Sequence, residues 1–364
     1  MGELRTAMTD DLEIAYYDNG PADGPVAVLL HGFPYDVLSF EAVVPLLAER
    51  GIRSITPYLR GYGPTRFREA TTLRSGQQAA VGQDLLDLID ALELQPPVVA
   101  GYDWGGRAAC IAAAVRPPQG IAGLVTVGGY AIQDIAASVE PAAPLDEYRD
   151  WYQWYFNTDR GRAGLEANRE ELCRLLWQLW SPEWAEADHA FTSSSPSLHN
   201  PDFVDVAVHS YRHRHRAAVG DDRFNELEAF LATSPPISVP TISLDALADG
   251  FGPDDSERDK QHFTGPFEIR RLPGIGHNVP QEAPRASPTL SPTFWPRFLE
   301  RTGDVAACSA PVASAPSPHS RVEEPEAMPE ISDGTATTTS KTFSRETRIA
   351  TTIDAPPRPL SGGS

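Results

Sequence analysis

An aspartate lies at the junction between a strand and a helix, in the segment Gly101-Tyr102-Asp103-Trp104-Gly105-Gly106. Glycines beside Asp103 permit a sharp turn, because a Cβ there would collide with neighbouring backbone. Such a turn presents the aspartate above the sheet, and the first N–H groups of the following helix favour its ionised form. The pattern predicts a carboxylate nucleophile; a simple helix cap at Asp103 is the alternative.

Other segments supply partners for this carboxylate. One predicted strand ends at Asp249, and the segment "GIGH" ends at His277, which gives the chain order nucleophile, acid, histidine. The segment "HGFP" ends the first buried strand and places Phe33 to offer a backbone N–H to an oxyanion, with Trp104 as the second donor. Asp134 is the alternative acid.

Short apolar runs alternate with helical patterns around these residues. Strands separated by helices pair in parallel, so the sequence predicts an α/β fold with a mostly parallel central sheet and helices on both faces. The predicted strands are 25–32, 51–59, 96–102, 121–130, 238–250 and 266–277, and the predicted helices are 39–50, capped by Ser39, 75–94 and 104–115.

The alternation of predicted strands and helices stops in the middle of the chain. Residues 140–235 carry only helical patterns and are expected to form an all-α cap, inserted before the acid strand and resting beyond the carboxyl ends of the strands. Residues 1–139 and 236–303 are then the two parts of the core. Residues 304–364, rich in Ser, Thr, Pro and Ala, are expected to be disordered.

Composition narrows the function classes. The 364 residues are 41% hydrophobic, enough for a large core, and 50 acidic against 30 basic residues give a net charge of -20. Nucleic acid and anionic membranes would be repelled by this charge, so neither is an expected partner. No apolar run reaches the length of a spanning helix and no signal peptide is recognisable, so we expect a cytoplasmic protein.

The sequence offers no metal or cofactor site. The 3 cysteines are widely spaced, which indicates neither a disulfide framework nor a thiolate metal site. Three histidines are close together in the segment "HSYRHRHR", but arginines alternate with them and would oppose a cation. This segment, which contains Arg212, Arg214 and Arg216, is interpreted as a solvated basic patch. The sequence does not indicate an oligomeric state.

Together these motifs resemble the α/β-hydrolase superfamily, and within it the branch with an aspartate nucleophile, which contains epoxide hydrolases, haloalkane dehalogenases and haloacetate dehalogenases. The likeness covers about residues 10–284 through "HGFP", "RGYGPT", "GYDWGG", "ALAD" and "GIGH". Tyr102 stands where these families usually have histidine. Prolines interrupt the stretch after His277 in which the family has a regular helix.

The resemblance also suggests an activity. "WYQWYF" and "HSYRHR" resemble the two cap segments of epoxide hydrolases, in which Tyr152 and Tyr211 would protonate the epoxide oxygen. Asp103 would form an alkyl ester, and His277, oriented by Asp249, would activate water. The expected substrate is a small apolar or aromatic epoxide. The residues expected to contact it are His31, Pro34, Gln153, Trp154 and Arg107.

Two alternatives remain open at this stage. A dehalogenase would use the same Asp-His-Asp set, with indole N–H groups of Trp104 and Trp154 for the halide and Arg107 for a substrate carboxylate. However, Trp104 stands where haloacetate dehalogenases have arginine, and Phe33 replaces the Asn or Glu of haloalkane dehalogenases. From another class, the chain could be a non-catalytic protein that binds a small ligand, with both tyrosines as ordinary core aromatics.

Overall fold

A computed structural model describes residues 1–116 and 118–285 of the chain. The predicted tail, 304–364, and the proline-interrupted stretch beyond 285 lie outside the described residues. No described helix is long and apolar enough to cross a membrane.

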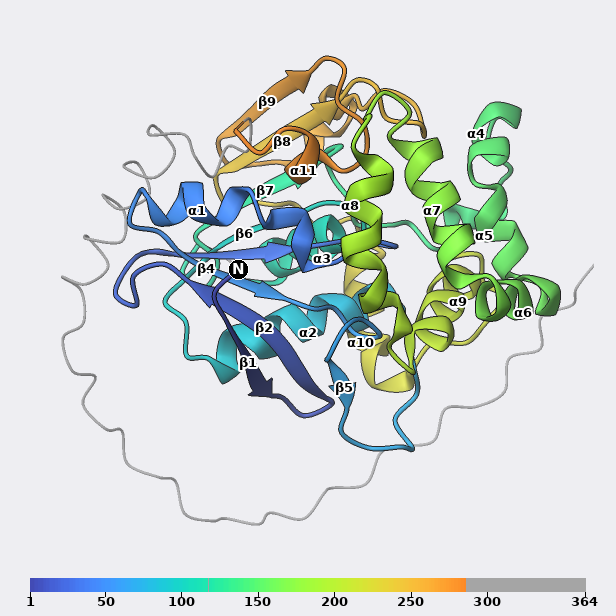
Figure 1. The fold of residues 1–364 in the computed structure, drawn as a ribbon, viewed down its shortest axis with the longest axis horizontal. Coiled ribbons are helices and arrows are strands. Elements are labelled where there is room, and N and C mark those ends of the chain that lie inside the picture. Colours follow the sequence, from blue (N-terminus) through green and yellow to red (C-terminus); the bar gives the residue numbers. More distant parts are fainter. Residues whose placement is uncertain (117, 286–364) are drawn as a thin grey trace, which may run out of the picture. The chain divides into compact units, whose positions relative to one another are not determined.

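A single twisted sheet is the scaffold of the described part (Figure 1). Its strand order is β1-β2-β4-β3-β6-β7-β8-β9, with β5 paired to β2; pairing is parallel from β4 to β9 and antiparallel among β1, β2, β4 and β5. The strands are β1 (Glu3–Met8), β2 (Leu12–Asn19), β3 (Val26–Leu30), β4 (Arg53–Pro57), β5 (Arg66–Phe67), β6 (Val98–Gly101), β7 (Gly123–Val127), β8 (Thr241–Ala246) and β9 (Phe267–Leu272).

The central strands are apolar because they are covered on both faces. Every residue of β3, "VAVLL", and of β6, "VVAG", is buried, as expected for parallel strands in the middle of a sheet. Helices α2 and α3 pack against each other, α3 packs on β3, β6 and β7, and α1 packs on β4. The prediction of an α/β fold with a mostly parallel sheet is confirmed.

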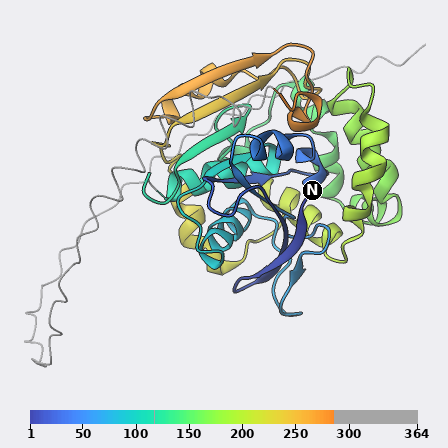
Figure 2. The same cartoon turned by 60° about the vertical axis from the view of Figure 1, so that its left-hand side comes forward.

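Helices fill two parts of the described chain. Between the core strands lie α1 (Val43–Ala48), α2 (Gln78–Ala91) and α3 (Asp103–Val115), and α11 (Val279–Glu282) follows β9. Between β7 and β8 lie α4 (Pro144–Arg149), α5 (Trp151–Phe156), α6 (Asp159–Ala167), α7 (Arg169–Trp180), α8 (Ala187–Ser194), α9 (Phe203–Arg214) and α10 (Asn225–Leu231). Figures 1 and 2 both show α5 to α9 gathered beside one end of the sheet.

Three local expectations differ from the structure. The antiparallel strands β1, β2 and β5 were not predicted, because β1 and β5 are mostly exposed and β2 mixes apolar residues with charged ones, so none carries a continuous apolar run. The helix expected over 39–50 is a 3-10 helix, Val37–Phe40, followed by α1. Ser39 does not cap it: Asp36 accepts from the N–H of Leu38, while the Ser39 hydroxyl bonds to the hydroxyl of Tyr102.

Candidate active site

Asp103 occupies the turn between β6 and α3 and is the first residue of the helix. Its φ of +51° lies in the left-handed region, which residues other than glycine rarely adopt. The neighbouring glycines allow close approach, since a Cβ on Gly32 would lie 2.6 Å from Asp103 Oδ1 and one on Gly105 would overlap the carbonyl oxygen of Leu30. The turn therefore holds the carboxylate tightly against the end of β3.

Two backbone N–H groups bind the same oxygen of Asp103. The N–H of Phe33 donates to Oδ1 over 2.7 Å and that of Trp104 over 2.6 Å. Burial by itself would raise the pKa of Asp103, but His277 and the charge of Arg107 outweigh it and hold that pKa below its ordinary value. The carboxylate is ionised, with Oδ1 bound by the main chain and Oδ2 directed to His277.

His277 connects the two carboxylates. Its Nδ1 lies 2.7 Å from Asp249 Oδ2, and its Nε2 lies 3.8 Å from Asp103 Oδ2. Asp249 is itself oriented, because its Oδ1 accepts from the N–H of Phe251 over 2.8 Å. Asp249 and His277 follow β8 and β9, which pair in parallel, so their loops emerge at the same edge of the sheet.

The charge of His277 depends on both partners. Burial lowers the pKa of His277, but the carboxylates of Asp249 and Asp103 outweigh burial and raise that pKa to about 10. The imidazole is therefore protonated at neutral pH, beside the ionised carboxylate of Asp103. Removing the charge of Asp103 would lower the pKa of His277 again.

The end of α7 ties these loops together, which the sequence did not indicate. The carbonyl oxygen of Trp180, the last residue of α7, accepts from the N–H of Gly250 over 3.0 Å and from the N–H of His277 over 3.2 Å. Next to it, the hydroxyl of Ser181 donates to Glu282 over 2.7 Å. In the sequence, the one hint of such a connection is the carboxylate of Glu282, a few residues beyond His277.

Glu282 completes this arrangement from α11. Its two carboxylate oxygens accept from the N–H groups of Gly276 over 2.7 Å and Asn278 over 3.1 Å, on either side of the histidine. The Glu282 carboxylate thus fixes the backbone that carries His277.

Tyr152 of α5 and Tyr211 of α9 are buried side by side. Their ring centroids lie 5.1 Å apart at 84°, and the ring of Phe33 packs within 6.2 Å of Tyr152 and 5.3 Å of Tyr211. Burial raises the pKa of both phenols, and the negative charge of Asp103 adds to the effect. The two phenols therefore lie close enough to the carboxylate for its charge to act on both.

The hydroxyls of the two tyrosines differ in their partners. Tyr152 Oη accepts from Gln153 Nε2 over 3.1 Å, whereas Tyr211 Oη has no hydrogen-bond partner within residues 1–116 and 118–285. Aromatic rings pack around Phe33. The rings packed on Phe33 are those of Trp104, Tyr152, Phe156, Trp180, Phe203 and Tyr211.

Two of the residues predicted to contact a substrate, His31 and Pro34, form hydrogen bonds within the protein. Burial lowers the pKa of His31 to about 4, so the ring is neutral; its Nδ1 contacts the carbonyl of Gly32 and its Nε2 accepts from the N–H of Leu59. The carbonyl of Pro34 accepts from the indole N–H of Trp177 over 3.1 Å. Direct substrate contact by either stays a prediction.

The other three lie in or beside the α5 and α3 helices. Gln153 is buried next to Tyr152, whereas Trp154 is 40% exposed and its ring packs 4.1 Å from that of His215. Arg107 is buried in α3, and among the described residues it has neither a hydrogen bond nor an ion pair. Burial lowers the pKa of Arg107 to about 10, but the side chain remains cationic at neutral pH.

The alternative residues lie elsewhere. Asp134 is exposed and accepts from the N–H of Ala137, far from the partners that Asp249 has. Asp245, inside β8, accepts from the hydroxyl of Ser256. No group of three His, Cys, Asp or Glu side chains in the described part is placed to hold a metal ion.

The predicted solvated basic patch is wrong for Arg212 and Arg214, which are half-buried and bind other side chains and the main chain, whereas Arg216 is exposed. Arg212 donates to the carbonyl of Phe156 and pairs with Asp159, while Arg214 lies over the ring of Tyr211, with its Cζ 5.1 Å from the ring centroid. Periodicity could not reveal this, because the partners belong to α5, α6 and the loop after β7.

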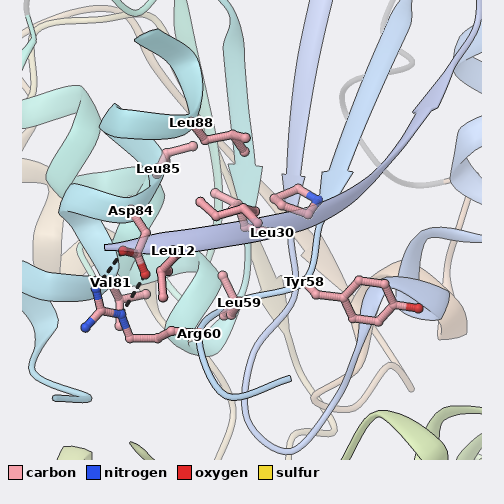
Figure 3. Close-up of a pocket in the computed structure, with 11 residues that line it drawn as sticks. Leu12, Leu30, Tyr58, Leu59, Arg60, Val81, Asp84, Leu85 and Leu88 are labelled. Carbon is pink, nitrogen blue, oxygen red and sulfur yellow. Dashed lines mark hydrogen bonds and ion pairs between the residues drawn. The ribbon is translucent and has the colours of Figure 1, made fainter. Parts of the chain in front are cut away.

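A separate small cavity is lined by residues of β2, β3, the segment after β4 and α2, and by none of the predicted catalytic residues (Figure 3). Leucines and the buried ion pair of Arg60 with Asp84 line it, with both N···O contacts at 2.6 Å. The remaining guanidinium N–H groups of Arg60 bind the carbonyls of Ser75 and Ala80. Every group here is satisfied, and the cavity holds no nucleophile, so it is structural.

Comparisons with known proteins identify the family of this fold. The family described as the alpha/beta hydrolase fold matches residues 25–173. Epoxide hydrolase B of Mycobacterium tuberculosis is 30% identical over 202 residues, covering 50% of this chain and 54% of that protein. A haloalkane dehalogenase of Mycobacterium marinum is 33% identical over 126 residues, 34% of this chain and 40% of that protein. The chain thus spans about half or less of these curated relatives.

A solved structure matches over a greater length. A Klebsiella pneumoniae protein, provisionally assigned as an epoxide hydrolase, is 42% identical, with a TM-score of 0.76 over 78% of this chain and 94% of that one. The similarity includes both the sheet and the helices between β7 and β8, given how much of each chain it spans.

Proposed function

Because the chain belongs to the α/β-hydrolase superfamily, we propose that it hydrolyses small epoxides through an alkyl ester on Asp103. The observation that carries the proposal is that the two oxygens of the Asp103 carboxylate have different partners. Two amide N–H groups hold Oδ1 and Oδ2 is directed to an imidazole, while a pair of buried phenols packs on the ring of Phe33, whose N–H binds the carboxylate. A carboxylate displaces well at saturated carbon, whereas a serine suits acyl carbon.

In the first step Asp103 Oδ2 attacks a ring carbon of the epoxide. The ring C–O bond breaks, and a hydroxyl proton of Tyr152 or Tyr211 passes to the leaving oxygen, since an alkoxide leaves poorly at neutral pH. The products are a hydroxyalkyl ester of Asp103 and a phenolate. The hydroxyl of Tyr211 is free for this role because no described residue accepts its proton.

In the second step His277 activates water. Esterification removes the negative charge of Asp103, which lowers the pKa of His277 from about 10 and lets the imidazole release its proton to solvent and act as a base. Water then attacks the ester carbonyl carbon. The charge develops on Oδ1, where the N–H groups of Phe33 and Trp104 each supply about 3 kcal/mol.

The cycle closes when the acyl C–O bond breaks. The diol leaves with a proton from His277, the carboxyl group of Asp103 then passes its proton to His277, and a proton from solvent restores the phenol, so the sum is epoxide plus water giving a diol. Asp249 keeps the imidazole oriented through Nδ1 throughout. The reaction needs only the substrate and water as partners.

We further propose that residues 140–235 form a cap over the site, with 1–139 and 236–303 as the core. Helices α5, α7 and α9 support this assignment, because they contribute Tyr152, Trp180 and Tyr211 to the rings around Phe33. A space lined by so many aromatic rings fits a small apolar or aromatic epoxide better than a polar one.

The test uses styrene oxide, with release of the diol as the readout. We expect diol formation by the full chain, and in the His277→Gln variant a covalent adduct on Asp103 detected by mass spectrometry. No diol and no adduct would exclude the proposal and favour a protein that only binds a ligand.

A dehalogenase is the second candidate, and one observation favours it. The indole N–H of Trp104 is buried without a partner in the described residues and is free to bind a leaving halide. Incubation with fluoroacetate and with a haloalkane, followed by halide measurement, separates the two activities. Halide release without diol release would assign the site to dehalogenation.

A further inference from the structure

We propose that Arg214 is a positioning residue that makes the tyrosine pair a stronger proton donor, through its cation over the Tyr211 ring and through the amide of Gln153. The inference rests on the proposed function, because it concerns the acid in the first step. It assigns a role to an arginine that the sequence placed in a solvated patch.

The cation of Arg214 is not neutralised by a carboxylate. Its Nε donates to Gln133 Oε1 over 3.1 Å and its Nη1 to Gln153 Oε1 over 2.9 Å, and no carboxylate oxygen of the described residues lies within ion-pair distance. The guanidinium Cζ lies 5.1 Å from the centroid of the Tyr211 ring. A cation so placed attracts a ring electrostatically, and attracts a phenolate more strongly than a phenol.

Gln153 carries the effect to the second tyrosine. An arginine can only donate hydrogen bonds, so the amide must present its oxygen to Arg214 and its NH₂ group to the other side. That NH₂ group donates to Tyr152 Oη over 3.1 Å and to Asp150 Oδ1 over 2.6 Å. Tyr152 Oη is therefore an acceptor here, and its own proton is left for the epoxide oxygen.

Loss of Arg214 would remove one of the two groups that fix this orientation; the other is the Asp150 carboxylate, an acceptor that holds the NH₂ group of Gln153. The amide of Gln153 would be held less firmly, and in the turned orientation its oxygen would accept the proton of Tyr152. His215, whose Nε2 lies 3.0 Å from Gln153 Oε1, does not impose the orientation, since a neutral imidazole can donate or accept there. Burial and then the charge of Arg214 lower the pKa of His215 to about 4, so it is neutral.

The charges near Tyr152 and Tyr211 differ in whether they favour loss of the phenol proton. Burial raises the pKa of Tyr152 and Tyr211, and the anions of Asp103 and Asp150 act in the same direction on Tyr152. Arg214 opposes these effects on both phenols. The charge of Arg107, on α3, also acts on both phenols. Among the residues that the structure describes, only Arg214 places its cation over one of the two rings.

The same helix offers a matched control. Arg212 lies two residues before Arg214 in α9, but its guanidinium pairs with Asp159 and contacts neither tyrosine. The variants are therefore R214Q, which removes the charge, R214K, which keeps it, and R212Q as the control. Ester formation and ester hydrolysis on styrene oxide are followed separately by rapid-mixing kinetics of tryptophan fluorescence.

We expect ester formation to fall about tenfold in R214Q, since general acids supply factors of this size or more. The rate of ester hydrolysis in R214Q should stay within about threefold of the native rate. Both rates in R212Q, and the rate of ester formation in R214K, should stay within the same range. The alkaline limb of the ester-formation rate should move to higher pH in R214Q, because the phenols hold their protons longer. Equal losses in both steps, an unmoved limb or an equal loss in R212Q would overturn the proposal.

A measurement without turnover separates this inference from the proposed function. The ¹³C resonance of Tyr152 Cζ, identified from the Tyr152→Phe variant, should shift in R214Q and not in R212Q. If the native protein makes no diol but this shift is seen, the proposed reaction fails while the Arg214 contact network stands. An unchanged resonance in R214Q overturns the inference whatever the activity.

Discussion

At the carboxylate end of the site main-chain hydrogen bonds hold each catalytic residue, whereas at the tyrosine end the packing of aromatic rings holds them. Asp103, Asp249 and the loop of His277 each accept or donate at least one main-chain hydrogen bond. Tyr211, by contrast, has an unpartnered hydroxyl and is placed by its ring contacts. Changes at the first end should affect the covalent chemistry, and changes at the second the proton transfer alone.

The largest effect is expected from Asp103→Asn. An amide cannot displace at carbon, so diol release should fall by about 10⁴-fold or more, a loss typical of a removed nucleophile. The protein should stay folded, because the amide oxygen can still accept from the N–H groups of Phe33 and Trp104. Diol release with styrene oxide measures the activity, and activity within tenfold of native would break the assignment of the nucleophile.

The same variant tests the electrostatics of the histidine. The carboxylates of Asp249 and Asp103 raise the pKa of His277 to about 10 against burial, so neutralising Asp103 should lower that pKa. Titration of the imidazole by NMR in the native protein and in Asp103→Asn gives the difference directly. An unchanged value would mean that Asp103 does not control the proton on His277.

His277→Gln is expected to separate the two chemical steps. Ester formation does not need a base, so the variant should release less than one equivalent of diol and retain the substrate on Asp103. Turnover should fall by about 10³-fold or more. Intact-protein mass spectrometry detects the ester, with Asp134→Asn as a control, since the exposed Asp134 lies outside the site.

His277 also gives stability a pH dependence of known sign. Its folded pKa, about 10, lies above the unfolded value of about 6.5, so its stabilisation is complete below 6.5 and lost as pH rises toward 10. Urea unfolding of the native protein should therefore show a decline across this range that is smaller in His277→Gln. Parallel pH curves for the two proteins would contradict the raised pKa.

At the tyrosine end, single Tyr152→Phe and Tyr211→Phe variants should each slow ester formation by about 10²-fold. The double variant should lose less than the product of the two factors if both hydroxyls serve the same oxygen. Ester hydrolysis should stay unchanged in each. Slower ester hydrolysis in either variant would show that this end of the site is not confined to proton transfer.

The same division explains what the sequence could and could not predict. Asp103 and Asp249 follow buried strands, whose ends are visible as breaks in apolar runs, and His277 follows the partly exposed strand β9 in a glycine-containing loop, so local pattern located all three. The contacts of Trp180, Glu282 and Arg214 join elements far apart in the chain, and no periodicity encodes such pairs. The antiparallel strands β1 and β2 were missed for another reason, since charged residues interrupt their apolar positions.

A smaller effect is expected at Glu282 of α11, which joins the end of α7 to the loop of His277. Glu282→Gln keeps the shape of the side chain, but its NH₂ group cannot accept from the N–H of Gly276 or Asn278. We expect turnover to fall about tenfold, with ester hydrolysis slowed more than ester formation because the change displaces His277. The rapid-mixing experiment above reports both steps, and equal slowing of the two would argue against an effect through the histidine.

The smallest effect is expected from Trp177→Phe. It removes the indole N–H that binds the carbonyl of Pro34 and keeps an aromatic ring against Tyr35. Loss of this buried hydrogen bond should cost about 1 to 3 kcal/mol of unfolding free energy, measured in urea. Because the N–H of Phe33, not the carbonyl of Pro34, binds Asp103, ester hydrolysis should change less than about threefold. A larger loss would show that α7 also sets the position of the Phe33 N–H, and the carboxylate end would then depend on the helices as much as the tyrosine end does.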